Sequence, residues 1–322
     1  MTTPAKIVLY TDCLFEEHEA PDEHPECAER AIVIASALER CGAVESRIQS
    51  VTGAIEDVLR IHDPDYVEAV RAAAEAGGAS LDADTYISPR SFEVALAASG
   101  TVVAATDAAL AASGDDPTKR AFAVVRPPGH HARPSRGMGF CLFNNVAVAA
   151  ARAREVGGLD RVAIVDFDVH HGNGTQEAFW REGGVLYVSL HRSPFYPGTG
   201  ARDETGEAGG KGANLNVPLG EGTTARQYQD AFRATLDAVA SFRPQLVIAS
   251  AGFDAYEDDP IGGLGLGLEH YRWIGAELRA LADATCDGRL VAALEGGYAL
   301  DALGDLAREF VEGMAGETQP PE

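Results

Sequence analysis

Short apolar segments alternate with longer helical patterns along the chain, and this alternation constrains the fold more than any other feature. Segments rich in Val, Ile, Leu and Ala predict β-strands at residues 6–10, 121–125, 161–169, 185–190, 246–252 and 290–295. Stretches rich in Ala, Leu, Glu and Arg predict helices at residues 26–41, 94–113, 144–157, 225–242 and 268–283. Because the strands are apolar on both faces, they need cover on both sides. The sequence therefore predicts an α/β fold with a mostly parallel central sheet and helices on both faces.

The chain is long enough to bury one large core. It has 322 residues, 46% of them hydrophobic, and no linker rich in Pro, Gly and Ser divides it. We expect one domain over residues 1–314 and a frayed tail over 315–322. The N-terminal segment lacks a basic region followed by an apolar core, so we expect neither export nor membrane insertion. Five scattered cysteines without a C-x-x-C pair are typical of reduced thiols and of a cytoplasmic protein.

The charge balance limits the classes of partner. The chain carries 26 basic and 49 acidic residues, a formal charge of −23. Nucleic acid is excluded as a direct partner, because phosphate binding needs clustered Lys and Arg. We interpret the acidity as a means of staying soluble; attraction of a cationic substrate, such as a lysine-rich peptide or a polyamine, is the alternative. The sequence leaves open whether the chain forms a homo-oligomer.

Polar residues follow four of the predicted strands at the point where each strand ends. They are Arg126 to His131, Asp166 to His170, Asp254, and Glu295 to Tyr298. In open α/β sheets, ligands bind beyond the carboxyl ends of the strands. The sequence therefore predicts a functional site at this edge of the sheet.

The stretch "RVAIVDFDVHHGNG" predicts a metal site. Asp166, Asp168 and His170 are spaced two apart, so on an extended strand they point to one face. Burying two carboxylates beside an apolar strand is costly unless a cation compensates them. We predict that Asp168 and His170 bind a metal, with Asp254 as the third ligand. Three protein ligands with an open position are typical of a catalytic site, and these donors suit Zn²⁺, Fe²⁺ or Mn²⁺.

Two adjacent histidines, His130 and His131, follow a stiff Pro-Pro-Gly turn. Beside a metal they would supply the base and the acid that amide hydrolysis needs, and Asp166 would orient one of them. The phenol of Tyr298, which follows two glycines, can donate to a developing oxyanion, although packing is the commoner role of such a tyrosine.

Aromatic and glycine residues predict a narrow slot. Gly139 and Phe140 would form one wall, with Phe195 or Tyr196 opposite; core packing explains their spacing equally well. The glycine-rich run at residues 262–267 follows no predicted strand and lacks the G-x-G-x-x-G spacing, so we reject a dinucleotide site.

Long motifs resemble one family. They are "RPPGHHARPSRGMGFCLFNN", "DFDVHHGNGTQEAFW", "VSLHRSPFYPGTG", "NLNVPL", "SAGFDAYEDDPIGG" and "LEGGY". In this order, over about residues 5 to 310, the chain resembles the zinc-dependent histone deacetylases of the arginase/deacetylase superfamily. The resemblance is closest to the class II-like branch, which includes bacterial histone deacetylase-like amidohydrolases and acetylpolyamine amidohydrolases. It implies the arginase/deacetylase fold, in agreement with the strand and helix pattern.

The resemblance also implies roles for individual residues. Zn²⁺ would be bound by Asp168, His170 and Asp254. The catalytic residues would be His130, His131, Asp166 behind His130, Asn173 and Tyr298. Substrate would be bound by Gly139, Phe140, Tyr196, the rim carboxylate Asp84, Ile261 and Gly297. A structural K⁺ or Na⁺ would lie at Ser189 and Leu190.

Two positions distinguish this chain from other branches of the family. Asn173 stands where other branches have Asp, and an amide stabilises an imidazolium less well, so His131 should be more readily neutral. Ile261 stands where a polyamine-specialised relative carries a carboxylate, which disfavours a polyamine substrate.

Our leading hypothesis is a metal-dependent amidohydrolase that removes acetyl or similar acyl groups from acylated lysine or related amines. An acetylpolyamine amidohydrolase is the alternative within this class. A protein that binds acylated ligands with negligible turnover is the alternative from another class, and the intact Tyr298 argues against it. Arginase-like hydrolysis with two Mn²⁺ ions is disfavoured, because it needs further bridging carboxylates.

Overall fold

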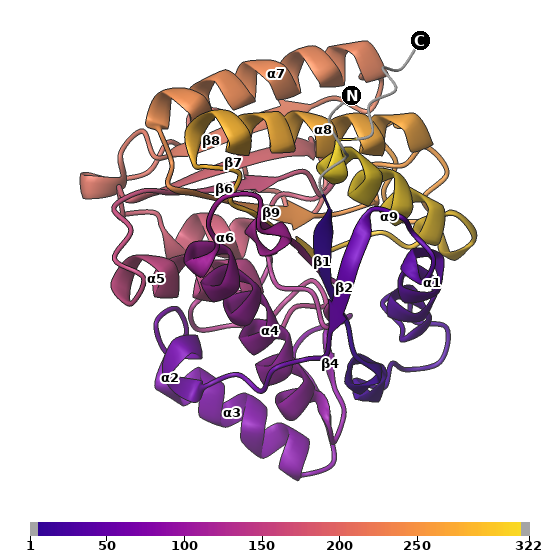
Figure 1. Cartoon of the computed structure of the whole chain (residues 1–322). Coiled ribbons are helices and arrows are strands. Elements are labelled where there is room, and N and C mark those ends of the chain that lie inside the picture. The colour runs from indigo at the N-terminus through magenta and orange to yellow at the C-terminus, as the bar shows by residue number, and fades with distance from the viewer. Residues whose placement is uncertain (1–5, 317–322) are drawn as a thin grey trace.

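An eight-stranded sheet forms the centre of the protein, with the strand order β2-β1-β5-β10-β9-β6-β7-β8 (Figure 1). The computed structural model describes residues 6–316. Every neighbouring pair in this sheet is parallel. The strands are β1 (Ile7–Tyr10), β2 (Val44–Ile48), β5 (Arg120–Ala123), β6 (Val162–Asp166), β7 (Val185–Arg192), β8 (Asn214–Leu219), β9 (Leu246–Ala251) and β10 (Leu290–Leu294). A separate antiparallel pair is formed by β3 (Ala79–Ser80) and β4 (Tyr86–Ile87).

Helices cover both faces of the sheet. They are α1 (Glu29–Leu38), α2 (Ile55–Val58), α3 (Pro64–Glu75), α4 (Ser91–Ala111), α5 (Asn145–Glu155), α6 (Asn173–Ala178), α7 (Ala225–Phe242), α8 (Leu268–Thr285) and α9 (Leu300–Ala315). Helices α1, α7, α8 and α9 share a core with one face of the strands, and α4 and α5 share a core with the other. Alternate residues of one strand enter different cores: Ala163 and Val165 of β6 face the first, and Ile164 faces the second. This arrangement confirms the predicted α/β fold.

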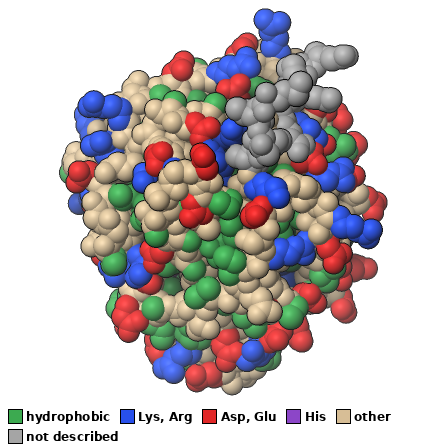
Figure 2. Space-filling view, in the orientation of Figure 1, with side chains coloured by type: hydrophobic (Ala, Val, Ile, Leu, Met, Phe, Trp, Pro, Cys, Tyr) green, Lys and Arg blue, Asp and Glu red, His purple; other side chains and the backbone are tan. Residues whose placement is uncertain are grey.

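The six predicted strands all form. The other two strands of the eight-stranded sheet, β2 and β8, are its edges, and neither these nor the short β3 and β4 were predicted. β2 reads VESRI and is exposed over most of its length, while β8 reads NLNVPL and contains a proline. Edge strands are partly solvated, so they lack the continuous apolar pattern of central strands. Figure 2 shows hydrophobic side chains near the middle of the face on which β2 lies, with charges of both signs around them.

Helix α4 is long and apolar enough to cross a membrane by length and composition alone. In the most apolar 18-residue stretch of α4, 72% is buried inside the protein, as expected for a core helix. Helix α9 ends at Ala315, one residue into the predicted tail, and residues 317–322 of that tail lie outside the described residues.

Candidate active site

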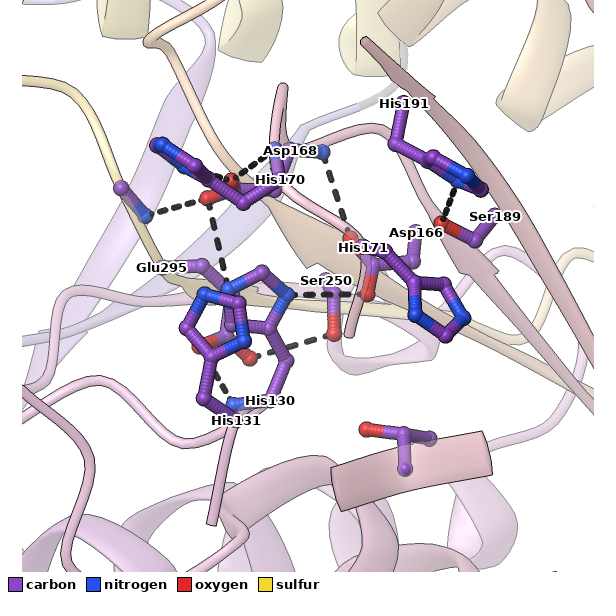
Figure 3. Close-up of polar contacts among 12 residues, drawn as sticks. His130, His131, Asp166, Asp168, His170, His171, Ser189, His191, Ser250 and Glu295 are labelled. Atoms are coloured by element: carbon purple, nitrogen blue, oxygen red, sulfur yellow. Dashed lines mark hydrogen bonds and ion pairs between the residues drawn. The ribbon is translucent and has the colours of Figure 1, made fainter. Parts of the chain in front are cut away.

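The topology brings four polar strand endings together. Strands β5, β10, β9 and β6 are consecutive in the sheet, so their carboxyl ends lie side by side. The histidine pair follows β5, the residues "EGGY" follow β10, and Asp254 follows β9. Asp166 is the last residue of β6, and Asp168 and His170 come directly after that strand. Figure 3 shows the resulting cluster, in which His130 lies between Asp166 and Asp168.

Asp168, His170 and Asp254 form a group that can hold a metal ion. Each offers one ligand atom, and these atoms lie within 4.8 Å of one another. His170 Nδ1 is 3.1 Å from Asp168 Oδ1 and 3.0 Å from Asp254 Oδ2. Both carboxylates are fully buried, and burial together with the charge of Asp168 raises the pKa of Asp254 to about 7. Two buried carboxylates beside an imidazole fit a divalent cation, which would compensate their repulsion.

The local backbone differs from the extended chain that the sequence predicts. β6 ends at Asp166, and the residues after it bend. The carboxylates themselves hold this bend: Asp168 Oδ1 accepts the N–H of His170 at 2.9 Å, and Asp254 Oδ1 accepts the N–H of Val169 at 2.9 Å. Asp168 and His170 are therefore brought together by a hydrogen-bonded turn and not by the alternation of a strand.

The ring centroids of His130 and His131 are 4.0 Å apart, and each ring is oriented by a different partner. His130 Nδ1 is 3.0 Å from Asp166 Oδ2, and His131 Nδ1 is 2.8 Å from Asn173 Oδ1. Burial opposes the charged form of His130, but the charges of Asp168 and Asp166 raise its pKa well above the usual value. Burial and the neighbouring cationic imidazoles hold the pKa of His131 well below the usual value. Both histidines thus lie with the partners that the resemblance implied.

Glu295 is a site residue to which the sequence motifs gave no role. Its buried Oε2 accepts the N–H groups of Gly129 at 2.7 Å and His130 at 3.0 Å, and Oε1 accepts the hydroxyl of Ser250 at 3.1 Å. Burial raises the pKa of this carboxyl to about 7. Glu295 therefore ties the loop after β5 to β9 and β10. The signal in the sequence was a carboxylate at the end of an apolar strand.

Tyr298, in the loop after β10, lines the same cavity as His130 and His131. Its ring lies edge-on to Phe140 with centroids 5.9 Å apart, and the Arg30 guanidinium carbon is 4.7 Å from the ring centre. Asp259 Oδ2 accepts the Tyr298 N–H at 2.7 Å. Gly297 has φ of +120°, and a Cβ there would lie 2.8 Å from the Phe253 side chain, so the turn before Tyr298 requires glycine.

A cavity of about 220 Å³ ends at these residues. Five of the six predicted substrate-binding residues line it: Asp84, Gly139, Phe140, Tyr196 and Ile261. The other lining residues are Pro128, His130, His131, His170, Phe195, Gly296 and Tyr298. Gly297 lies behind this lining, next to Gly296. A Cβ at Gly139, where φ is +55°, would lie 2.5 Å from the His131 ring, so glycine is required for the wall to approach the histidine.

His24 supports the rim and was not predicted. Its Nε2 is 3.0 Å from the carbonyl oxygen of Asp84, and its ring is edge-on to both Phe140 and Tyr86 at 4.8 Å. Ser189 and Leu190 lie on buried β7, away from the cavity lining; Ser189 Oγ is 2.9 Å from His191 Nδ1. The monovalent ion at Ser189 and Leu190 stays a prediction.

Comparisons with known proteins show the family of this chain. Residues 24–314 match the family described as "Histone deacetylase domain". The chain belongs to the histone deacetylase family. It is 44% identical over 245 residues to the histone deacetylase-like amidohydrolase of Pseudomonas aeruginosa, an alignment that covers 76% of this chain and 63% of that relative. It is 38% identical over 302 residues to a probable deacetylase of Archaeoglobus fulgidus, covering 91% of this chain and 82% of that one.

Solved structures of the family are close to this fold. The crystal structure of the HDA15 HD domain matches with a TM-score of 0.89 and 36% sequence identity. The match covers 97% of this chain and 89% of the HDA15 chain. The crystal structure of acetylpolyamine aminohydrolase from Burkholderia pseudomallei matches with a TM-score of 0.87 and 27% sequence identity. The match covers 97% of this chain and 99% of the aminohydrolase chain. These similarities support a deacetylase or amidohydrolase function and confirm the predicted family.

Proposed function

We propose that this chain is a metal-dependent amidohydrolase that removes acetyl or similar acyl groups from acylated lysine or related primary amines. One observation carries the proposal: the Asp168, His170 and Asp254 group and the two histidines meet at the end of a cavity with aromatic walls. Such a cavity suits an extended acyl-amine chain, with the amide at its polar end.

Asp168, His170 and Asp254 would hold the divalent cation. The family resemblance favours Zn²⁺, and Fe²⁺ or Mn²⁺ would suit the same donors. When bound, the ion would supply Lewis-acid activation of water and of the amide carbonyl. The resemblance further implies a structural K⁺ or Na⁺ at Ser189 and Leu190.

The opposed pKa shifts of the two histidines support different roles. His131, whose pKa is lowered, is neutral near pH 7 and can take a proton from the attacking water and then pass one to the leaving amine. His130, whose pKa the charges of Asp168 and Asp166 raise and whose Nδ1 is paired with Asp166, can stabilise negative charge in the transition state when it is protonated. Asn173 orients His131 through the 2.8 Å contact.

The remaining residues would bind the substrate and its transition state. The phenol of Tyr298 stays protonated, because burial raises its pKa well above the usual value, so it can donate a hydrogen bond to the oxyanion. Gly139, Phe140 and Tyr196 would contact the extended chain, and Asp84 would accept a hydrogen bond at the rim.

The test is hydrolysis of an acetyl-lysine peptide by the zinc-loaded protein, with acetylputrescine and acetylspermidine alongside. We expect turnover of the peptide, which disappears in a His131→Ala variant. Tight binding of the acylated peptides and polyamines without product would instead identify a binding protein. Preference for the polyamines would favour the alternative substrate class, although Ile261 lines the cavity without a charge for a second amine. A cytoplasmic location is also proposed; among the described residues the cysteines form no disulfide, which agrees with it.

A further inference from the structure

A second cavity, of about 510 Å³, lies beside the substrate cavity and shares a wall with it. Met138 and Pro197 line the second cavity, and their chain neighbours Gly139 and Tyr196 line the first. Asn173, which accepts the hydrogen bond from His131, also lines the second cavity. A substrate whose acylated chain occupies the first cavity can therefore extend over Tyr196 into the second.

Two charged side chains that line the second cavity, Arg136 and Glu204, have no ion-pair partner among the described residues. Arg133 forms an ion pair with Glu177 across the lining. Glu204 accepts a hydrogen bond from the amide of Gln176. Arg136 is exposed and lines the same cavity, and within residues 6–316 it forms no ion pair. In a chain with a formal charge of −23, a guanidinium without a carboxylate partner beside a binding cavity is a candidate for ligand recognition.

Tyr196 lines the substrate cavity, and the charges of both Arg136 and the acidic rim act on it. Its ring is edge-on to His131 with centroids 5.1 Å apart, which places it at the active-site end of the shared wall. Burial raises the pKa of the Tyr196 phenol, the charges of Asp84 and Asp82 raise it further, and the charge of Arg136 opposes them. The acidic rim and Arg136 therefore both lie within electrostatic range of one side chain at the mouth of the substrate cavity.

We propose that Arg136 binds a carboxylate of the substrate, so that acylated amines with a carboxylate close to the acylated side chain, such as a C-terminal acyl-lysine residue, are a preferred substrate class. This inference rests on the proposed amidohydrolase function. The planar guanidinium matches a carboxylate in a two-pronged contact. A carboxylate meets less repulsion from Glu204 than a phosphate dianion would, because it carries one negative charge and not two.

The test compares two short peptides that end in acetyl-lysine and differ only in the C-terminal group, a free acid or an amide. Wild-type protein should hydrolyse the acid with the lower KM. Arg136→Gln should raise the KM for the acid about three- to tenfold and leave the KM for the amide and both kcat values unchanged. Arg136→Lys should recover part of the loss. Arg181→Gln is the matched control, because Arg181 is an exposed arginine outside the lining of the second cavity.

The outcomes separate this inference from the proposed function. If wild-type protein hydrolyses the amide but shows no preference for the acid, or if Arg136→Gln changes both substrates equally, the carboxylate subsite is wrong and the amidohydrolase function stands. If the zinc-loaded wild type hydrolyses neither peptide but hydrolyses acetylputrescine or acetylspermidine, the carboxylate subsite is wrong and the amidohydrolase function stands. If it hydrolyses none of these substrates, both proposals are wrong. The preference for the acid should also weaken as ionic strength rises, because the contact is solvent-exposed.

Discussion

Replacing Glu295 tests how the catalytic histidines are held in place. The buried carboxylate accepts the N–H groups of Gly129 and His130 and the hydroxyl of Ser250. Glu295→Ala leaves both buried amides without an acceptor, and each such amide costs about 1–3 kcal/mol, so the free energy of unfolding should fall by about 2–6 kcal/mol. The loop that carries His130 and His131 should also lose its fixed position, so kcat should fall together with stability.

Glu295→Gln removes the charge and keeps an oxygen for the two amides, while its own NH₂ group can donate to Ser250. Burial raises the pKa of Glu295 from 4.5 to about 7, so the folded chain binds this proton more tightly than the unfolded chain does. Stability from this group is therefore fully present below the unfolded pKa of 4.5 and is lost as the pH rises through 7. Between pH 5 and 8 the loss is about 2–3 kcal/mol.

The assay is urea unfolding of the wild type and both variants at pH 5 and pH 8, with a chelator present throughout. Wild type should lose about 2–3 kcal/mol of unfolding free energy between pH 5 and pH 8 through Glu295, and Glu295→Gln should not lose it. The stability of Glu295→Gln relative to wild type should therefore rise by that amount. Glu56→Gln, at an exposed position on α2, is the matched control and should show no such gain. An equal difference between wild type and Glu295→Gln at both pH values would refute the titration argument. Full stability and activity of Glu295→Ala would refute the positioning role.

Three further predictions follow from named contacts. Tyr298→Phe keeps the ring and loses the phenol, so kcat should fall about 10²- to 10³-fold with an unchanged melting temperature; unchanged kcat would contradict the oxyanion role. Asn173→Asp places a carboxylate against His131 Nδ1, which raises the pKa of His131; the acidic limb of the pH–rate profile should move to higher pH, and an unmoved profile would argue against the coupling. Glu26 is buried and accepts from Arg126 Nε at 2.6 Å, so Glu26→Gln should cost about 3–5 kcal/mol in denaturant unfolding; a loss below 1 kcal/mol would contradict that estimate.

The sequence predicts the parts of the fold and site whose signal is local. The central strands have continuous apolar runs, and the site residues follow directly after them, so the sheet and the grouping of Asp168, His170 and Asp254 could be inferred before the structure. The edge strands β2 and β8 lack such runs because one side of each is not covered by a neighbouring strand. Their position depends on the rest of the sheet.

The roles that sequence reasoning did not assign, those of Glu295 and His24, depend on long-range contacts with the backbone. Glu295 bonds to an amide 166 residues away, and His24 lies against the carbonyl of Asp84, 60 residues away. No periodicity or short motif encodes such a contact. The bend after Asp166 was missed for a related reason, since it depends on Asp254 accepting an amide hydrogen from the segment after β6.

The most direct test of the metal site is a crystal structure of the zinc-loaded protein, with anomalous scattering recorded at the zinc edge. We predict one strong zinc peak per chain, enclosed by Asp168, His170 and Asp254, and its loss in an Asp254→Ala variant. Asp166→Asn, which alters the neighbouring carboxylate outside this group, should keep the peak. Zinc bound elsewhere, or these three side chains turned away from a common point, would contradict the proposed catalytic centre.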